Sequence, residues 1–398
     1  MKLQSARPAR QPALRGLLAT ALSLLSAVAL VVGCGGGVGS GGTGSFASGP
    51  ITGFGSVIVG GVRFDDSGAQ VEDLDGLRRS RDDLRLGMTV EIDSSAVSAG
   101  AAGATATATR IRFESEISGL VGLVDLAGGS FTLLGQRVTV DAATVFDEAI
   151  AGGLAGLGVG QPVEVYAVFD AAQQRYRATR VEPAALALGL RLRGPVLELN
   201  TAAQTLRVGG ASYSYAAASG VPAALAVGQF VRLRLEAELQ PTPRWVVRSF
   251  GTALQPLADA DGVKVEGLIT AYTSPSAFNV NGRAVDASGV VPGGSLGVGV
   301  RVEVEGNLRN NVLRATRVVV KSDDDVIGRG FELDGMISAR NAGGTSFVLR
   351  GVTVNTTRSD LRYDDGSAAD LLVGRRVEVR GVLSADRRSV DATRIRFR

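Results

Sequence analysis

The sequence contains no histidine and a single cysteine, and aromatic residues make up only 5% of its 398 positions. Histidine is the usual base of Ser-His-Asp and Cys-His sites and the commonest metal ligand, so its absence excludes those enzymes and most zinc sites. One cysteine cannot form an internal disulfide, so the fold must depend on its hydrophobic core. These absences predict a non-enzymatic protein without a cofactor. Carboxylate-only catalysis, as in glycosidases, is the enzymatic alternative.

The N-terminus has the pattern of an export signal. Residues 17–32 are apolar apart from small Thr and Ser, and the basic residues before them are Lys2, Arg7, Arg10 and Arg15. A basic start followed by a short apolar run is typical of a secretory signal. Small residues directly before Cys34 resemble a bacterial lipobox, which predicts a lipoprotein signal peptide over 1–33 and diacylglyceryl transfer to Cys34. The run is shorter than the roughly 20 residues of a spanning helix, and an uncleaved anchor is the alternative.

Removal of this signal changes the charge of the chain. Residues 1–33 hold four of the 42 basic residues and none of the 39 acidic ones, which leaves 38 basic and 39 acidic residues and a net charge of −1. Near-neutral charge and few aromatic residues argue against the basic, aromatic-lined grooves that bind single-stranded nucleic acid. We therefore expect no nucleic-acid partner. The glycine-rich segment 34–49 is typical of a flexible coil, and we interpret it as a tether.

One sequence motif occurs five times in the chain. Its clearest copy alternates polar and apolar residues over 376–380, the period of a half-buried strand. The glycine before this strand recurs at intervals of 73, 68, 71 and 75 residues, as Gly87, Gly160, Gly228, Gly299 and Gly374. Such a period marks an array of small domains. The predicted repeats, numbered one to five below, are residues 50–113, 114–182, 188–250, 262–320 and 331–398.

Each repeat is expected to fold as a small barrel. A glycine-marked strand comes first, and residues 56–64 then alternate on both sides of Gly60-Gly61, a strong hairpin signal. Residues 368–372 predict one helical turn, which Gly374 ends in the left-handed conformation. Two further strands complete a five-stranded barrel of the OB-like type. The sequence therefore predicts an all-β protein, a tandem array of five small five-stranded OB-like barrels after a signal peptide and flexible tether.

The last two strands of each repeat carry charges that predict their register. We predict the register of each hairpin by placing its turn midway between a glutamate on one strand and an arginine on the other. In four repeats this midpoint falls in a turn-like segment, and the predicted pairs are Glu91 and Arg110, Glu164 and Arg180, Glu303 and Arg317, and Glu378 and Arg394. The third repeat breaks this rule, because Arg232 would oppose Arg248. We interpret these side chains as solvent-facing pairs that contribute about 0.2–1 kcal/mol each and set register more than stability.

Acidic clusters are the candidates for a metal site. Asp323, Asp324 and Asp325 are the best of three clusters, because calcium prefers oxygen ligands in loops. The others lie at 73–76 and 364–366. None has the spacing of a twelve-residue calcium loop, and solvated turns explain them equally well. We expect no metal site and keep the three aspartates as weak candidates.

Residues 49–64 and 86–92 resemble the opening of bacterial proteins built from repeats of domain-of-unknown-function 5666. The later Val-Gly-x-x-Val-Glu-Val and Ala-Thr-Arg phrases are similar to the same family, so the resemblance covers nearly all of 50–398. The third repeat departs most, with Arg232 in place of glutamate and residues 245–248 in place of Ala-Thr-Arg. The resemblance implies a lipoprotein with repeated small β-domains, and it brings no activity or catalytic residue.

Together these patterns predict a lipid-anchored, non-enzymatic envelope protein that displays repeated barrels for binding or structural purposes. Repeated modules on one tether favour avidity for a repetitive partner, such as an envelope glycan or an assembled protein. Gly35 after Cys34 agrees with an outer-membrane location, facing the periplasm or the cell surface. The alternatives are an assembly factor or accessory subunit of another exported protein, or a carboxylate-dependent enzyme acting on glycans, with its site in the third repeat.

Overall fold

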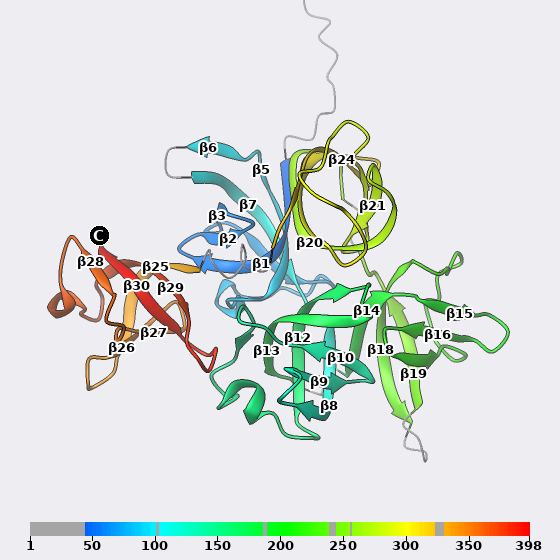
Figure 1. Cartoon of the computed structure of the whole chain (residues 1–398), viewed down its shortest axis with the longest axis horizontal. Helices are drawn as coiled ribbons and strands as arrows, with labels where there is room; N and C mark the ends of the chain where they lie inside the picture. The colour runs from blue at the N-terminus through cyan, green and yellow to red at the C-terminus, as the bar shows by residue number, and fades with distance from the viewer. Residues whose placement is uncertain (1–43, 101–102, 186–188, 239–243, 255–256, 323–329) are drawn as a thin grey trace, which may run out of the picture. The chain divides into compact units, whose positions relative to one another are not determined.

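The computed structural model describes residues 44–398, apart from 101–102, 186–188, 239–243, 255–256 and 323–329 (Figure 1). The predicted signal peptide, Cys34 and most of the predicted tether lie outside the described residues. Within them the chain forms strands, loops and short 3-10 turns, which confirms the all-β prediction. No helix in this part of the chain has the length and apolar character needed to cross a membrane.

The second repeat shows how one unit is built. Its main strands are β8 (Ile117–Asp125), β9 (Ser130–Leu133), β10 (Gln136–Thr139), β12 (Pro162–Asp170) and β13 (Arg175–Pro183). β8 pairs antiparallel with β9, and β9 pairs antiparallel with β10. β10 lies parallel to β13, and β12 joins β13 back to β8, which closes the ring. The order first, second, third, fifth, fourth is that of an OB-like barrel, as the sequence predicts.

The first, fourth and fifth repeats close in the same order. The first repeat contains β1 (Gly44–Phe54), β2 (Val57–Val59), β3 (Val62–Asp65), β5 (Thr89–Ser95) and β7 (Gly103–Phe113). The fourth contains β20 (Ala260–Ser274), β21 (Ala277–Val280), β22 (Arg283–Asp286), β23 (Arg301–Arg309) and β24 (Val312–Val320). The fifth contains β25 (Phe331–Arg340), β26 (Ser346–Leu349), β27 (Val352–Asn355), β29 (Arg376–Leu383) and β30 (Val390–Phe397). Shorter strands are β4 (Gln70–Asp73), β6 (Ser98–Gly100), β11 (Val145–Phe146) and β28 (Arg362–Asp364).

The third repeat differs in its first strand, which is divided in two. Its strands are β14 (Leu190–Pro195), β15 (Glu198–Asn200), β16 (Thr205–Val208), β17 (Ala211–Ser214), β18 (Phe230–Glu238) and β19 (Arg244–Gly251). At the break, the Val196 N–H donates to Gln229 O at 2.9 Å and the Leu197 N–H donates to Arg207 O at 2.8 Å. The two halves therefore stay bonded to opposite neighbours. In the other repeats a β-bulge in the first strand makes the same change of partner.

The recurring glycine fixes the start of the fourth strand. Its φ lies between +81° and +86° in all five repeats, at Gly87, Gly160, Gly228, Gly299 and Gly374. In each repeat its N–H donates to a backbone carbonyl of the first strand or of the break within it, at 2.7–2.9 Å. The predicted left-handed Gly374 is thus confirmed. Single 3-10 turns precede it in three repeats, at η1 (Arg81–Asp83), η2 (Gly153–Gly156) and η4 (Ala368–Asp370).

The predicted charge register is wrong by two residues in four repeats and by three in the third. The observed partners are Glu91 with Arg112, Glu164 with Glu182, Glu303 with Val319, and Glu378 with Arg396, while Arg232 pairs with Gly251. A β-bulge in each of these hairpins shifts the pairing, and bulges leave no mark in a polar and apolar alternation. The expected solvent exposure is also wrong for four of these side chains, which are buried: Glu91, Arg180, Glu303 and Arg232 are 7%, 4%, 3% and 4% exposed.

The first strands also join different repeats. β1 lies parallel to β20 at Ala47 and Lys264, and parallel to β25 at Gly53 and Glu332. β8 lies antiparallel to β14. One buried apolar core accordingly extends through the first and fifth repeats, a second through the second and third, and a third fills the fourth. The repeats therefore share strand pairs and cores with one another.

Replacing Gly374 by alanine tests the role of the recurring glycine. A Cβ there meets no atom within 4 Å, so the cost is the left-handed backbone alone, at φ +85°. We expect Gly374→Ala to lower the free energy of unfolding by about 1–2 kcal/mol in urea denaturation. Gly297→Ala is the control, because its Cβ also meets nothing and its φ is ordinary. Equal losses in the two variants would contradict this explanation.

Candidate functional site at the junction of the repeats

The structure does not bring the predicted site residues together. Cys34 and the three aspartates Asp323, Asp324 and Asp325 lie outside the described residues. Within the described part of the chain, no group of acidic side chains is arranged to hold a metal ion. The two remaining acidic clusters make ion pairs instead: Asp73 with Arg79 at 2.8 Å, and Asp364 with Arg394. The most unusual chemistry lies at the junction of the first three repeats.

Arg232 of β18 is the centre of this junction. Its side chain is 4% exposed and makes two hydrogen bonds to the Glu114 carboxylate, both at 2.5 Å. It makes two more to Asp75, at 2.6 and 2.9 Å, and Arg234 also pairs with Asp75. The hydrogen bond from Arg232 lowers the pKa of Asp75 to about 2. One guanidinium of the third repeat thus satisfies carboxylates of the first and second, with the paired geometry that arginine favours.

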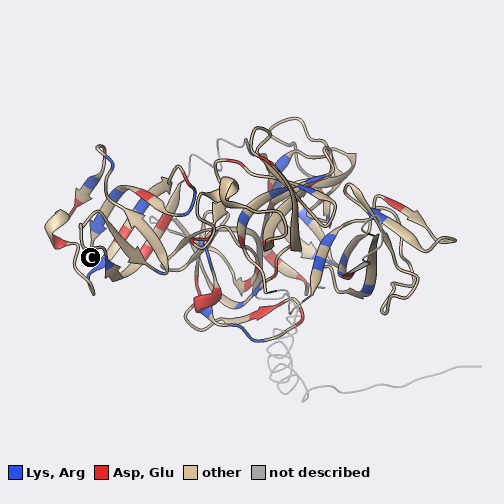
Figure 2. Cartoon of the chain, turned by 90° about the horizontal axis from the view of Figure 1, so that it is seen from below, with Lys and Arg blue, Asp and Glu red and all other residues tan. Residues whose placement is uncertain are grey.

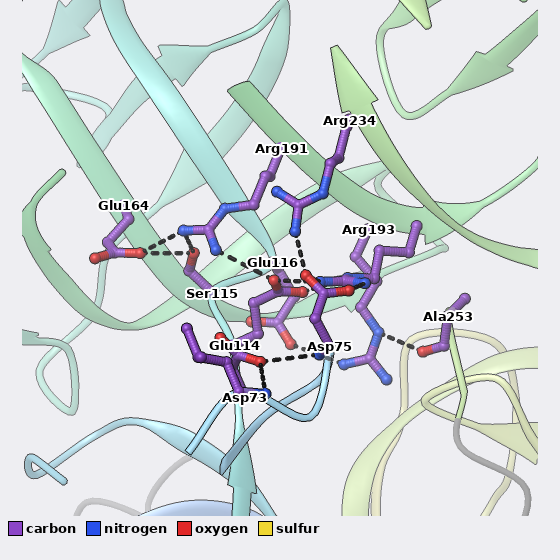
Figure 3. Close-up of polar contacts among 12 residues, drawn as sticks. Asp73, Asp75, Glu114, Ser115, Glu116, Glu164, Arg191, Arg193, Arg234 and Ala253 are labelled. Carbon is purple, nitrogen blue, oxygen red and sulfur yellow. Dashed lines mark hydrogen bonds and ion pairs between the residues drawn. The ribbon is translucent and has the colours of Figure 1, made fainter. Parts of the chain in front are cut away.

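A second arginine, Arg191 of β14, extends the junction. Its guanidinium lies between Glu114, at 3.2 Å, and Glu164, at 2.9 Å (Figure 3). The Ser115 hydroxyl donates to the same Glu164 oxygen at 2.9 Å and accepts from Arg191 at 3.3 Å. Glu114 therefore has arginine partners on both sides. We call the set Asp75, Glu114, Glu164, Arg191 and Arg232 the junction cluster.

Beside the junction cluster, Glu116 lines a small cavity of about 50 Å³. The Glu116 carboxylate accepts the Ala167 N–H at 2.9 Å and lies 3.5 Å from the Arg193 guanidinium. Arg193 in turn donates to Ala253 O at 2.7 Å (Figure 3). Burial raises the pKa of Glu116 to about 7, although Arg193 acts against this shift. Glu91 lies in the same cavity, and its Oε2 has no hydrogen-bond partner there.

The geometry of the junction cluster and of the cavity around Glu116 suits contacts between repeats better than catalysis. A group with a pKa near 7 is a good general acid or base only when a substrate can reach it. Ligand pockets usually measure about 300–1,000 Å³, and the cavity around Glu116 is far smaller. Elsewhere in the described chain, acidic and basic residues are interspersed along the strands (Figure 2). The carboxylates of the junction cluster and Glu116 therefore hold the first three repeats together, since each has an arginine partner across a repeat boundary.

Sequence reasoning missed most of this site. Glu114 and Glu116 lie between β7 and β8, and Arg191 and Arg193 lie on β14. Each pair is spaced by two, as is typical of one face of an extended segment. The one signal in the sequence was Arg232, which stands where the other repeats have an acidic residue. That departure suggested an active site in the third repeat, whereas the structure gives it a role in pairing between repeats.

Comparisons with known proteins agree with the repeat architecture. The family described as Domain of unknown function (DUF5666) matches residues 119–182, 266–319 and 334–396. These segments are the second, fourth and fifth repeats, so the resemblance stated from the sequence is confirmed there. The first and third repeats lie outside the matched segments but have the same strand order. A search of curated protein sequences found no match.

Among solved structures, the chain is similar to one described as drosophila Unr CSD456. The identity is 16%, and the alignment covers 53% of this chain and 99% of that one, with a TM-score of 0.15.

Removal of the Arg232 guanidinium tests the junction cluster. Arg232→Met keeps an unbranched side chain but leaves Glu114 and Asp75 without their main partner. Breaking a buried pair from one side costs about 3–5 kcal/mol, and we expect that loss in urea denaturation. Arg248→Met is the control, because Arg248 and Glu236 pair at 2.6 Å with side chains 67% and 52% exposed, and such pairs contribute about 0–1 kcal/mol. Equal effects would remove the distinction between the two sites.

Glu116→Gln tests the raised pKa. The folded chain keeps the Glu116 proton up to about pH 7, whereas the unfolded chain releases it near 4.5. The folded state thus binds more protons between these values, and the free energy of unfolding contributed by Glu116 falls as pH rises from 4.5 to 7. The fall amounts to about 3 kcal/mol. We expect the difference between wild-type and Glu116→Gln stability curves to show it; a constant difference over this range would contradict the assignment.

Proposed function

We propose that this chain, three of whose repeats match the DUF5666 family, is a non-enzymatic binding scaffold of the bacterial cell envelope. In this proposal the protein is exported, and a lipid on Cys34 holds it at the outer membrane. The first three barrels are joined at the junction cluster, and the barrels present their outer faces to a partner in the envelope. The buried junction of charges from three repeats is the observation that carries the proposal.

The anchoring part of the proposal rests on the N-terminal sequence. Residues 1–33 combine basic charge, a short apolar run and small residues before Cys34, as lipoprotein signals do. The glycine-rich residues after Cys34 supply a spacer before β1, which begins at Gly44 within the predicted tether. Diacylglyceryl transfer supplies two acyl chains, and two lipid chains give stable anchoring at a membrane.

The scaffold part rests on the way charge is buried. Asp75, Glu114 and Arg232 come from the first, second and third repeats and bond to one another away from solvent. Buried ion pairs are poor sources of stability but define which surfaces fit together. The junction cluster therefore favours one arrangement of the barrels. A fixed arrangement suits a partner whose binding groups are also spaced regularly, because several barrels then bind it at once.

In-cell crosslinking of the full-length protein, followed by mass spectrometry, tests the proposal. We expect envelope glycan or peptidoglycan fragments attached to several repeats. Cys34→Ala should reduce their capture strongly, because the protein is then no longer concentrated at the membrane. Ser40→Ala, in the same glycine-rich segment, is the matched control and should leave capture unchanged. A single stoichiometric protein partner would instead favour an assembly factor or accessory subunit, and absence of any envelope partner would overturn the proposal.

A further inference from the structure

We propose that a polar cavity between the first and second repeats binds a neutral carbohydrate unit. The cavity measures about 380 Å³ and is distinct from the small cavity around Glu116. This volume falls in the range of about 300–1,000 Å³ that is usual for small-molecule sites. The proposal deepens the binding function above by naming a ligand class, and it rests on that function for the source of the sugar in the cell.

The wall from the second repeat is the outer face of β12 and β13. Glu164 and Tyr166 are two residues apart on β12, so both side chains lie on one face of the strand. Glu182 of β13 is the direct cross-strand partner of Glu164, and Arg180 is that of Tyr166. The two glutamates therefore lie next to each other at the cavity wall. The opposite wall comes from the first repeat, from β4 to the start of β5.

Carboxylates dominate the lining, but most already have partners. The six that line the cavity are Asp73, Asp83, Glu114, Asp147, Glu164 and Glu182. Arg180 pairs with Asp147 at 2.6 Å and with Glu182, and the other pairs involve Asp73, Glu114 and Glu164, as described above. Asp83 accepts the Ser80 N–H at 2.8 Å. The charges are thus largely compensated within the protein, which disfavours a cation as the main ligand.

Tyr166 supplies a hydroxyl that a ligand in the cavity can use. The residue is 3% exposed, and its ring belongs to the apolar core shared with the first repeat. It also lines the cavity, yet its hydroxyl has no hydrogen-bond partner among the described residues. By contrast, the hydroxyls of the two fully buried tyrosines are bonded within the fold: Tyr176 to Arg193 O at 2.7 Å, and Tyr213 to Leu134 O at 2.8 Å. The Tyr166 hydroxyl is not among the buried polar atoms that lack a partner, so it is open to the cavity and can bond a ligand hydroxyl there.

The mixture of groups selects a ligand with hydroxyls. Paired carboxylates still offer acceptor lone pairs, while Arg79, Arg85 and Arg191 at the wall offer N–H donors. A hydroxyl group both donates and accepts, so neighbouring hydroxyls of one sugar ring can satisfy both kinds of group. The lining has few apolar residues, which disfavours a lipid or an aromatic ligand. These properties together fit a neutral saccharide of one or two units.

Calorimetric titration of the full chain, purified in a detergent without sugar head groups, tests the inference. The soluble probes are glucose, N-acetylglucosamine, cellobiose and chitobiose, with spermidine as the cationic and glucuronate as the anionic comparison. We expect at least one neutral saccharide to bind more tightly than either charged probe. Tyr166→Phe should weaken that binding about three- to tenfold, the value of one hydrogen bond, with the urea midpoint unchanged because the hydroxyl has no partner in the fold.

Two controls separate binding from stability. Tyr272→Phe removes a half-buried hydroxyl on β20 that does not line the cavity, and it should leave saccharide affinity unchanged. Tyr176→Phe should lower the urea midpoint, because its hydroxyl bonds to Arg193 O. Failure of every neutral saccharide to bind, preference for spermidine, or equal affinity in Tyr166→Phe would each overturn the inference. Saccharide binding in vitro without envelope capture in cells would refute the proposed function alone.

Discussion

The arrangement of the first three repeats depends on one buried guanidinium. Arg232 is almost fully excluded from solvent, and its hydrogen bonds go to carboxylates on two other repeats. Charges removed from water must find partners of good geometry, because an unpaired buried charge costs several kcal/mol, about 3–5 when one partner is lost. Any other placement of the third repeat would leave Arg232, Glu114 and Asp75 uncompensated. The junction cluster thus restricts how the barrels pack more than it strengthens them.

The first strand of each repeat has two roles, one within its own repeat and one between repeats. Within a repeat it changes partner midway, from the fourth strand to the second, through a bulge or a break. Between repeats, β1 also meets β20 and β25, and β8 meets β14. Strand ends that would otherwise present unpaired backbone groups are covered in this way. Intra-repeat closure and inter-repeat packing therefore use the same element.

The fold was predictable because its signals are local. The recurring glycine, the Gly60-Gly61 turn and the alternation of apolar residues each act within a few residues, and all led to the observed strand order. The register was not predictable, since a bulge after Tyr166 or Arg380 leaves the alternation unchanged. The site was hidden for a different reason. Arg232 is 118 residues from Glu114 and 157 from Asp75, and no pattern within one repeat encodes those contacts.

The glycine bond to the first strand lies wholly inside one repeat. In each repeat a left-handed glycine donates its N–H to the first strand, or to the break within it, of the same repeat. The turn before the fourth strand therefore needs no contact from a neighbouring repeat, and the charge four residues after the glycine can differ between repeats without loss of this bond. Arg232 stands at that position, where the other four repeats have glutamate, and it gives the third repeat a charge opposite to those of Glu114 and Asp75.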